Sequence, residues 1–98
     1  MAPTFPHLFQ PIRIGTKQSR NRIMRLGTQT NTGENGMATE RTVALYRHLA
    51  RGGAGIIVSE SVRVHASNTG SAHTLQLYLE HSVPSLAKVA QAVRDSRS

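Results

Sequence analysis

The sequence predicts an α/β fold built on a parallel sheet, and three observations support this. An amphipathic helical segment runs into Arg51–Gly55, where two adjacent glycines release the helix and a third lets backbone approach backbone closely. The next run, Ile56–Val58, is β-branched throughout. Its strand is therefore predicted to be buried on both faces, as in a parallel sheet covered by helices. A strand–loop–helix unit also occurs twice along the chain, as α/β folds require.

The chain is strongly basic, and its charge limits the classes of partner. Its 98 residues carry 12 Lys and Arg against 5 Asp and Glu, a formal charge of +7, and the first acidic residue is Glu34. A basic N-terminal third of this kind fits nucleic acid, a phosphorylated ligand or the carboxylates of another chain. Only two Phe and two Tyr are present, so basic and aromatic residues do not alternate as they do in base-stacking surfaces. Nucleic acid is therefore the weaker expectation.

Residue types alone exclude several chemistries. Cysteine is absent, which rules out thiolate nucleophiles, disulfides and Cys metal sites in this sequence. The five histidines show no metal-ligand spacing, so no metal site is predicted. No apolar run approaches the ~18 residues of a membrane span, and the N-terminus lacks the charged start and apolar core of a signal peptide. We expect a cytoplasmic protein with no membrane partner.

The N-terminal segment is predicted to contain a lead-in, a hairpin and a first strand. Residues 1–7 carry two prolines and are expected to be extended and loosely held. Over residues 8–19, Ile12 and Ile14 alternate with a basic residue ahead of a glycine turn, a pattern typical of a short hairpin with one wet face. Residues 21–27 then form a candidate strand.

A loop and a helix follow this strand. Residues 28–36 are a loop by composition, and an Asn-Gly pair closes its turn. Thr39 is the expected N-cap of the helix, with Glu40 placed favourably against the helix dipole. The apolar stripe of this helix is expected to comprise Val43, Tyr46 and Ala50, flanked by Leu45 and Leu49. A double glycine ends the helix, and the second strand follows over residues 55–59.

The C-terminal third repeats the order of loop and helix. A polar loop is expected over residues 65–73, followed by a short apolar patch and by a helix with Ser82 as its N-cap and Pro84 in its first turn. The patch consists of Leu75, Leu77 and Leu79. The predicted buried face of the helix consists of Leu86, Val89, Ala90 and Val93, which repeat at i, i+3, i+4 and i+7.

The topology predicts where a site should lie. A right-handed βαβ connection brings the carboxyl ends of both strands to one edge of the sheet, so the loops after Leu26 and after Glu60 should face a common site. Glu60 itself ends a buried strand, where an unpaired carboxylate is costly. We expect Glu60 to pair with an arginine, Arg22 being the candidate, or to accept backbone amides, in a structural role.

Three motifs occur in order along the chain. They are Leu8–Gly15, Asn21–Ile23, and Tyr46 together with Ala50–Glu60. In order and spacing they resemble the old yellow enzyme and 2,4-dienoyl-CoA reductase-like NADH:flavin oxidoreductase family, over about Leu8 to Asp95. The resemblance implies an N-terminal hairpin plus the first two βα units of a (β/α)8 TIM barrel, with the hairpin closing its bottom. A closed barrel needs ~250 residues, so residues 8–98 are expected to form an incomplete, N-terminal part of a flavin-binding barrel.

The resemblance also implies FMN as cofactor and assigns residues to it. The backbone of Leu26, Gly27 and Thr28 would lie against the flavin ring. Gln29 would face the O4 and N5 edge, where its amide can donate to a reduced flavin, and Ser61 would contact the ring from the second strand. Many relatives have Pro-Met where this chain has Gly27-Thr28. No catalytic residue is expected in this segment, because the family places the substrate-anchoring residues and the proton donor on later strands.

The implied activity is hydride transfer from NAD(P)H through FMN to an activated alkene of the enoate or dienoyl type, or the oxidation of an amine. Some relatives carry a 4Fe-4S cluster, which here would need cysteines from a later segment. A small-molecule substrate and a homo-oligomer of the full-length protein are further expectations. The alternatives are a basic module that binds RNA or an acidic partner, and a non-catalytic remnant. The 98-residue chain alone is expected to be inactive and partly unfolded, because its parallel strands have open edges.

Overall fold

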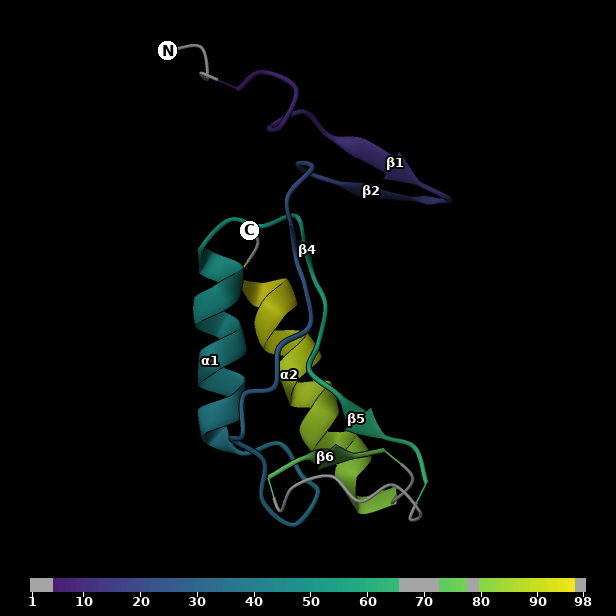
Figure 1. Cartoon of the computed structure of the whole chain (residues 1–98), viewed down its shortest axis with the longest axis vertical. Coiled ribbons are helices and arrows are strands. Elements are labelled where there is room, and N and C mark those ends of the chain that lie inside the picture. Colours follow the sequence, from purple (N-terminus) through teal and green to yellow (C-terminus); the bar gives the residue numbers. More distant parts are fainter. Residues whose placement is uncertain (1–4, 66–72, 78–79, 97–98) are drawn as a thin grey trace.

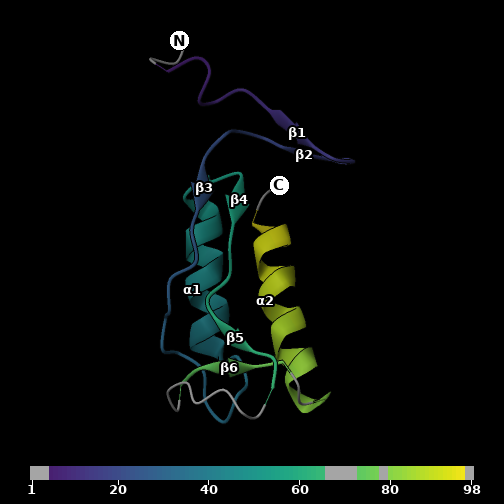
Figure 2. The ribbon, with the colours of Figure 1, turned by 45° about the vertical axis from the view of Figure 1, so that its right-hand side comes forward.

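The computed structural model describes residues 5–65, 73–77 and 80–96. In these ranges the chain forms β1 (Ile12–Ile14), β2 (Lys17–Ser19), β3 (Met24–Arg25), α1 (Glu40–Arg51), β4 (Ile56–Ile57), β5 (Val62–Arg63), β6 (Leu75–Gln76), the 3-10 helix η1 (Glu80–Ser82) and α2 (Val83–Asp95). The two α-helices lie side by side, and the hairpin of β1 and β2 extends away from them beyond the end of α1 (Figure 1). β3 and β4 run next to each other along the helices (Figure 2).

The predicted hairpin is confirmed. β1 and β2 pair antiparallel along their whole length, and Gly15 makes the turn at φ +60°. The hairpin is tied to the next segment because the Arg22 amide donates to the Leu8 carbonyl at 2.9 Å. Of the lead-in expected over residues 1–7, only residues 5–7 are described, and they are exposed. The boundary after residue 7 stays a prediction.

β3 and β4 form the parallel pair that the sequence predicts. Met24 lies opposite Ile56, and Arg25 lies opposite Ile57. Both strands are shorter than the predicted segments, with 2 residues each. The prediction that the second strand is buried on both faces is wrong: Val58, directly after β4, is 40% exposed. The reason is that, of the described elements, only the hairpin lies against the outer side of this sheet: Ile12 and Ile14 share a cavity with Met24 and Ile56, which leaves the Val58 end uncovered.

A buried asparagine joins β3 to the glycine-rich turn before β4. The side-chain amide of Asn21 donates to the Gly53 carbonyl at 2.7 Å. Its oxygen accepts from the amides of Gly55 at 2.7 Å and Ile23 at 3.1 Å. A Cβ on Gly55 would lie 2.6 Å from this oxygen, so only glycine allows the approach. The close backbone contact predicted for the third glycine is therefore present, and it couples two of the three sequence motifs.

α1 begins and ends as predicted. The Thr39 hydroxyl accepts from the Thr42 amide at 3.3 Å, and the Thr42 hydroxyl accepts from the Thr39 amide at 3.1 Å, which completes a capping box. Beyond the helix, Gly53 adopts φ +104°, a conformation that favours glycine. The apolar stripe is buried at Tyr46 and Ala50, and Thr42, which the apolar pattern does not include, is fully buried beside them.

A second parallel pair, β5 with β6, was not expected from the sequence. The Gln76 amide in β6 donates to the Gly36 carbonyl at 2.9 Å, so the loop after β3 reaches this pair. Leu75 of the predicted apolar patch is buried, with 2% of its surface exposed, whereas Leu79 lies outside the described residues. Most of the polar loop predicted over residues 65–73 also lies outside them.

α2 differs from the prediction at its start and on its face. The turn η1 precedes it, so Ser82 has helical backbone angles of φ −84° and ψ −21° and makes no side-chain capping bond. Pro84 lies in the first turn as expected, but the buried residue of the helix is Ala92. The predicted buried face lines a cavity, so three of its residues are only half-buried and Ala90 is exposed. This face consists of Leu86, Val89, Ala90 and Val93.

The apolar core of the described residues is small. Its buried side chains are Tyr46, Ala50, Leu75 and Ala92. The radius of gyration is 15.3 Å, against about 13 Å for a compact domain of this length. No described helix is long and apolar enough to cross a membrane. The radius of gyration thus indicates an elongated chain, and the outer side of its β3–β4 sheet is open at the end of Val58 and Leu26.

Candidate functional site

The predicted cofactor residues lie at one end of the β3–β4 pair. Leu26, Gly27, Thr28 and Gln29 follow β3, and Ser61 lies four residues beyond β4. All five are exposed, Leu26 by 70%. Both segments leave the carboxyl ends of neighbouring parallel strands (Figure 2). The structure thus brings together the two loops that the topology predicts to share a site, while the roles of the five residues toward a cofactor stay predictions.

The loop of residues 26–29 is anchored at both ends to the segment that continues from β4. At its start, the Val58 amide donates to the Arg25 carbonyl at 2.9 Å. At its end, the amide and hydroxyl of Thr30 donate to the Glu60 carboxylate at 3.3 and 2.7 Å. Four residues, 26–29, lie between Arg25 and Thr30, whereas only Ser59 lies between their partners Val58 and Glu60. Residues 26–29 are thus a four-residue loop whose first anchor is a backbone bond and whose second anchor is the Glu60 side chain.

The amides of this loop are available to a ligand. Within the described residues, the N–H groups of Gly27, Thr28 and Gln29 donate no hydrogen bond to the protein, and all three residues are exposed. A Cβ on Gly27 would lie 2.8 Å from the Ser59 carbonyl oxygen, so the loop passes closely against its neighbour. A polar ligand can take up these donors without first breaking a hydrogen bond within the protein.

An exposed apolar surface lies beside the loop. Ile57 lines the cavity on the helix side of the sheet. Because strand residues alternate between faces, Ile56 and Val58 face away from the helices, and so does Met24, the partner of Ile56. Met24 is 50% exposed, Val58 40% and Leu26 70%. Exposed apolar side chains and unbonded loop amides therefore lie next to each other at this end of the sheet.

A buried carboxylate stands behind the loop. Glu60 is 2% exposed and accepts three hydrogen bonds, two from Thr30 and one from the Tyr46 hydroxyl at 3.2 Å. Its own amide donates to that hydroxyl at 2.8 Å. The sequence predicts that Glu60 either accepts backbone amides or pairs with Arg22. Its carboxylate does accept a backbone amide, that of Thr30, whereas the prediction of a pair with Arg22 is wrong. Arg22 precedes β3 at the opposite end of the sheet and is exposed.

Tyr46 and Arg25 complete the surroundings of this carboxylate. Burial raises the pKa of Tyr46 above its ordinary 10.0, because it disfavours the phenolate, and the negative charge of Glu60 acts in the same direction. The hydrogen bond from the Glu60 amide and the charge of Arg25 act to lower it. Among the described residues, Arg25 Nη1 is buried without a hydrogen-bond partner. The Arg25 guanidinium therefore lies on the side of the sheet that faces the helices, as does its strand partner Ile57.

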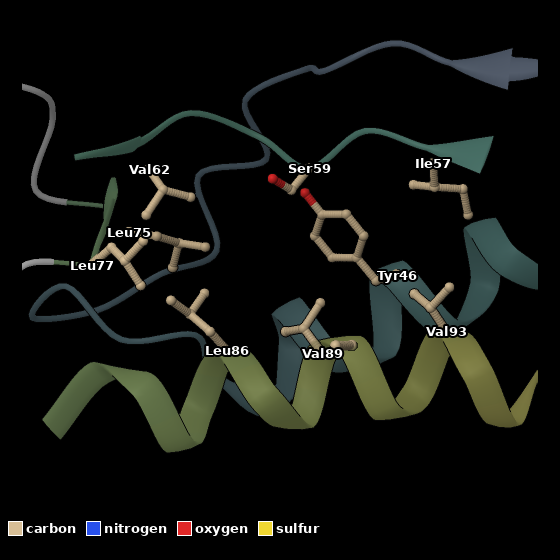
Figure 3. Close-up of a pocket in the computed structure, with 10 residues that line it drawn as sticks. Tyr46, Ile57, Ser59, Val62, Leu75, Leu77, Leu86, Val89 and Val93 are labelled. Atoms are coloured by element: carbon tan, nitrogen blue, oxygen red, sulfur yellow. The ribbon is translucent and has the colours of Figure 1, made fainter. Parts of the chain in front are cut away.

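A cavity of 430 Å³ lies between α2 and the strands, on the helix side of β4 (Figure 3). None of the predicted cofactor residues lines it. Its lining is apolar except for the hydroxyls of Tyr46 and Ser59, so it offers no charge to an anionic cofactor. The described residues also contain no group of three side chains that could hold a metal ion. The strand-end loop is the stronger candidate for a site.

Sequence reasoning missed the polar network that supports the loop. It treated Tyr46 only as an apolar residue of the helix stripe, and it assigned no role to Thr30, Thr32 or Thr42. A signal was present, because threonines occupy every second position of residues 28–32. Alternation of this kind predicts hydroxyls on one side of an extended segment. In the structure Asn31 adopts φ +57° between Thr30 and Thr32, and their hydroxyls meet at 2.8 Å.

The fold and the site define a class: a βα segment of an α/β protein with an exposed loop at the carboxyl ends of two parallel strands. A solved complex of 2-naphthoyl-CoA reductase with 2-naphthoyl-CoA matches 94% of this chain and 14% of its own, at 31% identity and a TM-score of 0.88. The old yellow enzyme from Trypanosoma cruzi matches 95% of this chain and 25% of its own, at 26% identity and a TM-score of 0.81. A metal reductase of Desulforamulus reducens is 38% identical over 88 residues, 89% of this chain.

The model of the NADH:flavin oxidoreductase / NADH oxidase family matches residues 7–98. The chain belongs to this family. The resemblance inferred from the three motifs is therefore confirmed, and the chain has the fold of a segment of the old yellow enzyme barrels. It spans 13% of the length of the metal reductase. The activity and the substrate of the whole protein are therefore proposed, not shown.

Proposed function

We propose that this chain forms the hairpin and the first two βα units of a (β/α)8 barrel that binds FMN at the carboxyl ends of its strands. The observation that carries this proposal is the loop of residues 26–29, with its exposed amides between two anchors and beside an exposed apolar surface. Membership of the family supports the cofactor. Active sites of such barrels lie at the same end of the strands.

The residues present fit a flavin. Its ring is flat, with apolar faces and polar atoms along its edge. Leu26 and Val58 offer apolar contact to a face, while the amides of Gly27 and Thr28 and the side chain of Gln29 offer donors to the edge. Ser61 adds a hydroxyl from the neighbouring loop. Bound FMN would supply the acceptance and donation of hydride.

The part of this chain in the reaction is to bind and orient the ring. Donors aimed at the ring edge favour the form that carries more negative charge, and donors fixed in advance need little reorganisation during the reaction. The anchors at Arg25 and Thr30 supply this fixation. We assign no proton transfer to substrate to any residue of this chain.

For the whole protein, we propose transfer of hydride from NAD(P)H through FMN to an activated alkene of the enoate or dienoyl type, or oxidation of an amine. The likeness to a 2-naphthoyl-CoA reductase bound to 2-naphthoyl-CoA supports a conjugated small molecule as substrate. A cytoplasmic location, a homo-oligomer, and a 4Fe-4S cluster held by cysteines outside residues 1–98 belong to the same proposal.

Titration with FMN of the natural gene product that contains residues 1–98 tests the site. In Gly27→Val, the new side chain meets the Ser59 carbonyl at 2.8 Å and should displace the loop, raising the Kd for FMN about tenfold or more. Gly52→Ala is the control, since Gly52 has helical angles at the end of α1, and its Kd should stay within about twofold. Absence of FMN binding, or equal affinity in both variants, would contradict the site. RNA binding that falls steeply with salt would favour the alternative of a basic binding module.

A further inference from the structure

We propose that Glu60 and Thr30 are positioning residues for the flavin: they fix the loop of residues 26–29 without touching the ring. The role toward flavin rests on the proposed function. The ordering of the loop rests on the geometry of this chain alone. The two parts can therefore be tested separately.

Glu60 holds Thr30 at two points. Glu60 Oε2 accepts from the Thr30 amide at 3.3 Å, and Oε1 accepts from the Thr30 hydroxyl at 2.7 Å. Two donors of one residue on two oxygens of one carboxylate restrict the rotation of Thr30 as well as its position. Gln29 shares a peptide group with Thr30, so the end of the loop is oriented too.

The carboxylate is itself held by a buried side chain of α1. The Tyr46 hydroxyl accepts from the Glu60 amide at 2.8 Å and donates to Glu60 Oε1 at 3.2 Å. Tyr46 and Glu60 are each 2% exposed. Main chain and side chain of Glu60 are thus tied to the same phenol, and the anchor has little rotamer freedom left to lose when a ligand binds.

A chain of threonine hydroxyls has one consistent proton direction. Thr30 donates its hydroxyl proton to Glu60, so it accepts from Thr32 at 2.8 Å. Since each hydroxyl carries one proton, Thr32 must accept from Thr42 at 2.7 Å. Thr42 in turn accepts from the Thr39 amide at the start of α1. Every hydroxyl proton of the chain points toward the carboxylate, so the loop is connected to the helix cap as well as to the strand.

The result is a loop with two fixed ends and unbonded amides between them. The first end is the bond from the Val58 amide to the Arg25 carbonyl, and the second is the pair of Thr30 and Glu60. Donors that are fixed before a ligand arrives bind it at a smaller entropic cost. Loss of the second end should therefore weaken FMN binding although every residue that contacts the ring is unchanged.

The test compares Thr30→Val, which keeps the volume and removes the hydroxyl donor, with Thr30→Ser, which keeps the donor. Thr30 is only half-buried, so both variants should fold. In the flavin-free natural gene product, the protection factor of the residue-30 amide against hydrogen exchange should fall about tenfold in Thr30→Val and in Glu60→Gln, and stay near wild type in Thr30→Ser. The Kd for FMN should rise about tenfold in Thr30→Val and return to within about twofold in Thr30→Ser.

Glu34→Gln is the matched control, because Glu34 is an exposed carboxylate in the same connection; it should change neither measurement. Unchanged exchange in both Thr30→Val and Glu60→Gln would overturn the positioning role, whether or not FMN binds. Faster exchange with unchanged affinity, in a protein that binds FMN, would overturn its flavin part. A wild-type protein that binds no FMN would contradict the proposed function and the flavin part with it, while the exchange result still decides the ordering of the loop.

Discussion

At the scale of single residues, Asn21 does the most to join the two halves of the sheet. Its side chain makes three hydrogen bonds to backbone groups, two of them in the glycine-rich turn more than 30 positions away. Removal of this side chain would take the acceptor from the Ile23 amide and the donor from the Gly53 carbonyl, and it would leave the buried Gly55 amide with the Ile23 carbonyl, at 3.1 Å, in place of its shorter bond to Asn21. Buried groups that lose their partners cost more than the bond itself contributed.

Asn21→Ala should therefore lower the free energy of unfolding by about 3 kcal/mol. Gln18→Ala, at an exposed position of β2, is the control and should change it by less than about 0.5 kcal/mol. Urea denaturation of the natural gene product measures both values. Equal shifts of the unfolding midpoint in the two variants would show that Asn21 acts only as a surface residue.

Tyr46 gives a prediction for alkaline pH. Burial raises its pKa in the folded state above 10.0, so the stability that it contributes is fully present below its unfolded pKa of about 10 and is lost as the pH rises through the folded value. The tyrosinate absorbance of the wild type minus that of Tyr46→Phe should thus have its midpoint above pH 10, near the onset of alkaline unfolding. A midpoint at or below 10 would mean that the phenol is not buried as described.

At the scale of elements, the sequence predicts what local patterns determine. The hairpin follows from alternation and a glycine turn, and α1 follows from its cap at Thr39 and its apolar period. β5 and β6 could not be predicted, because each has two residues and is held by a distant contact such as that between Gln76 and Gly36. The period of α2 predicted its apolar face correctly, but burial of that face depends on what packs against it.

For the candidate site, the sequence predicts the positions of the two loops but not the side chains that support them. The loop positions followed from a topological rule and from the resemblance to a flavoenzyme family. The support of the loop did not, because Glu60 takes its partners from residues 14 and 30 positions away. A charge rule suggested Arg22 as partner, yet a carboxylate can be satisfied by neutral donors, and here Thr30 and Tyr46 supply them.

The cap of α1 tests how the helix depends on the threonine network. The Thr39 hydroxyl accepts from the Thr42 amide and donates to the Thr32 carbonyl at 2.7 Å. Thr39→Ala should cost about 1 to 2 kcal/mol of stability, and Thr39→Ser, which keeps the hydroxyl, should cost less than about 0.5 kcal/mol. Thermal unfolding followed by helical circular dichroism measures the difference. Identical melting temperatures for the two variants would contradict a capping role.

At the scale of the whole molecule, the sheet separates two surfaces with different chemistry. On the helix side, a cavity of 430 Å³ is lined by apolar side chains. On the other side, Leu26 and Val58 are exposed beside a loop whose amides make no bond within the described residues. Of these two surfaces, only the second combines apolar contact with backbone amides that make no bond within the described residues, a combination that suits the face and edge of a flavin. The expectation that the 98-residue chain alone is partly unfolded stays a prediction, although the small core agrees with it.

The measurement that tests this account most directly is amide hydrogen exchange of the natural gene product with and without FMN. We predict that FMN slows exchange at Gly27, Thr28 and Gln29 by about tenfold or more, because these amides gain an acceptor, and leaves the lining of the cavity along α2 unchanged. Protection confined to α2, or none at the loop when FMN is bound, would contradict the assignment of the flavin site to the strand ends.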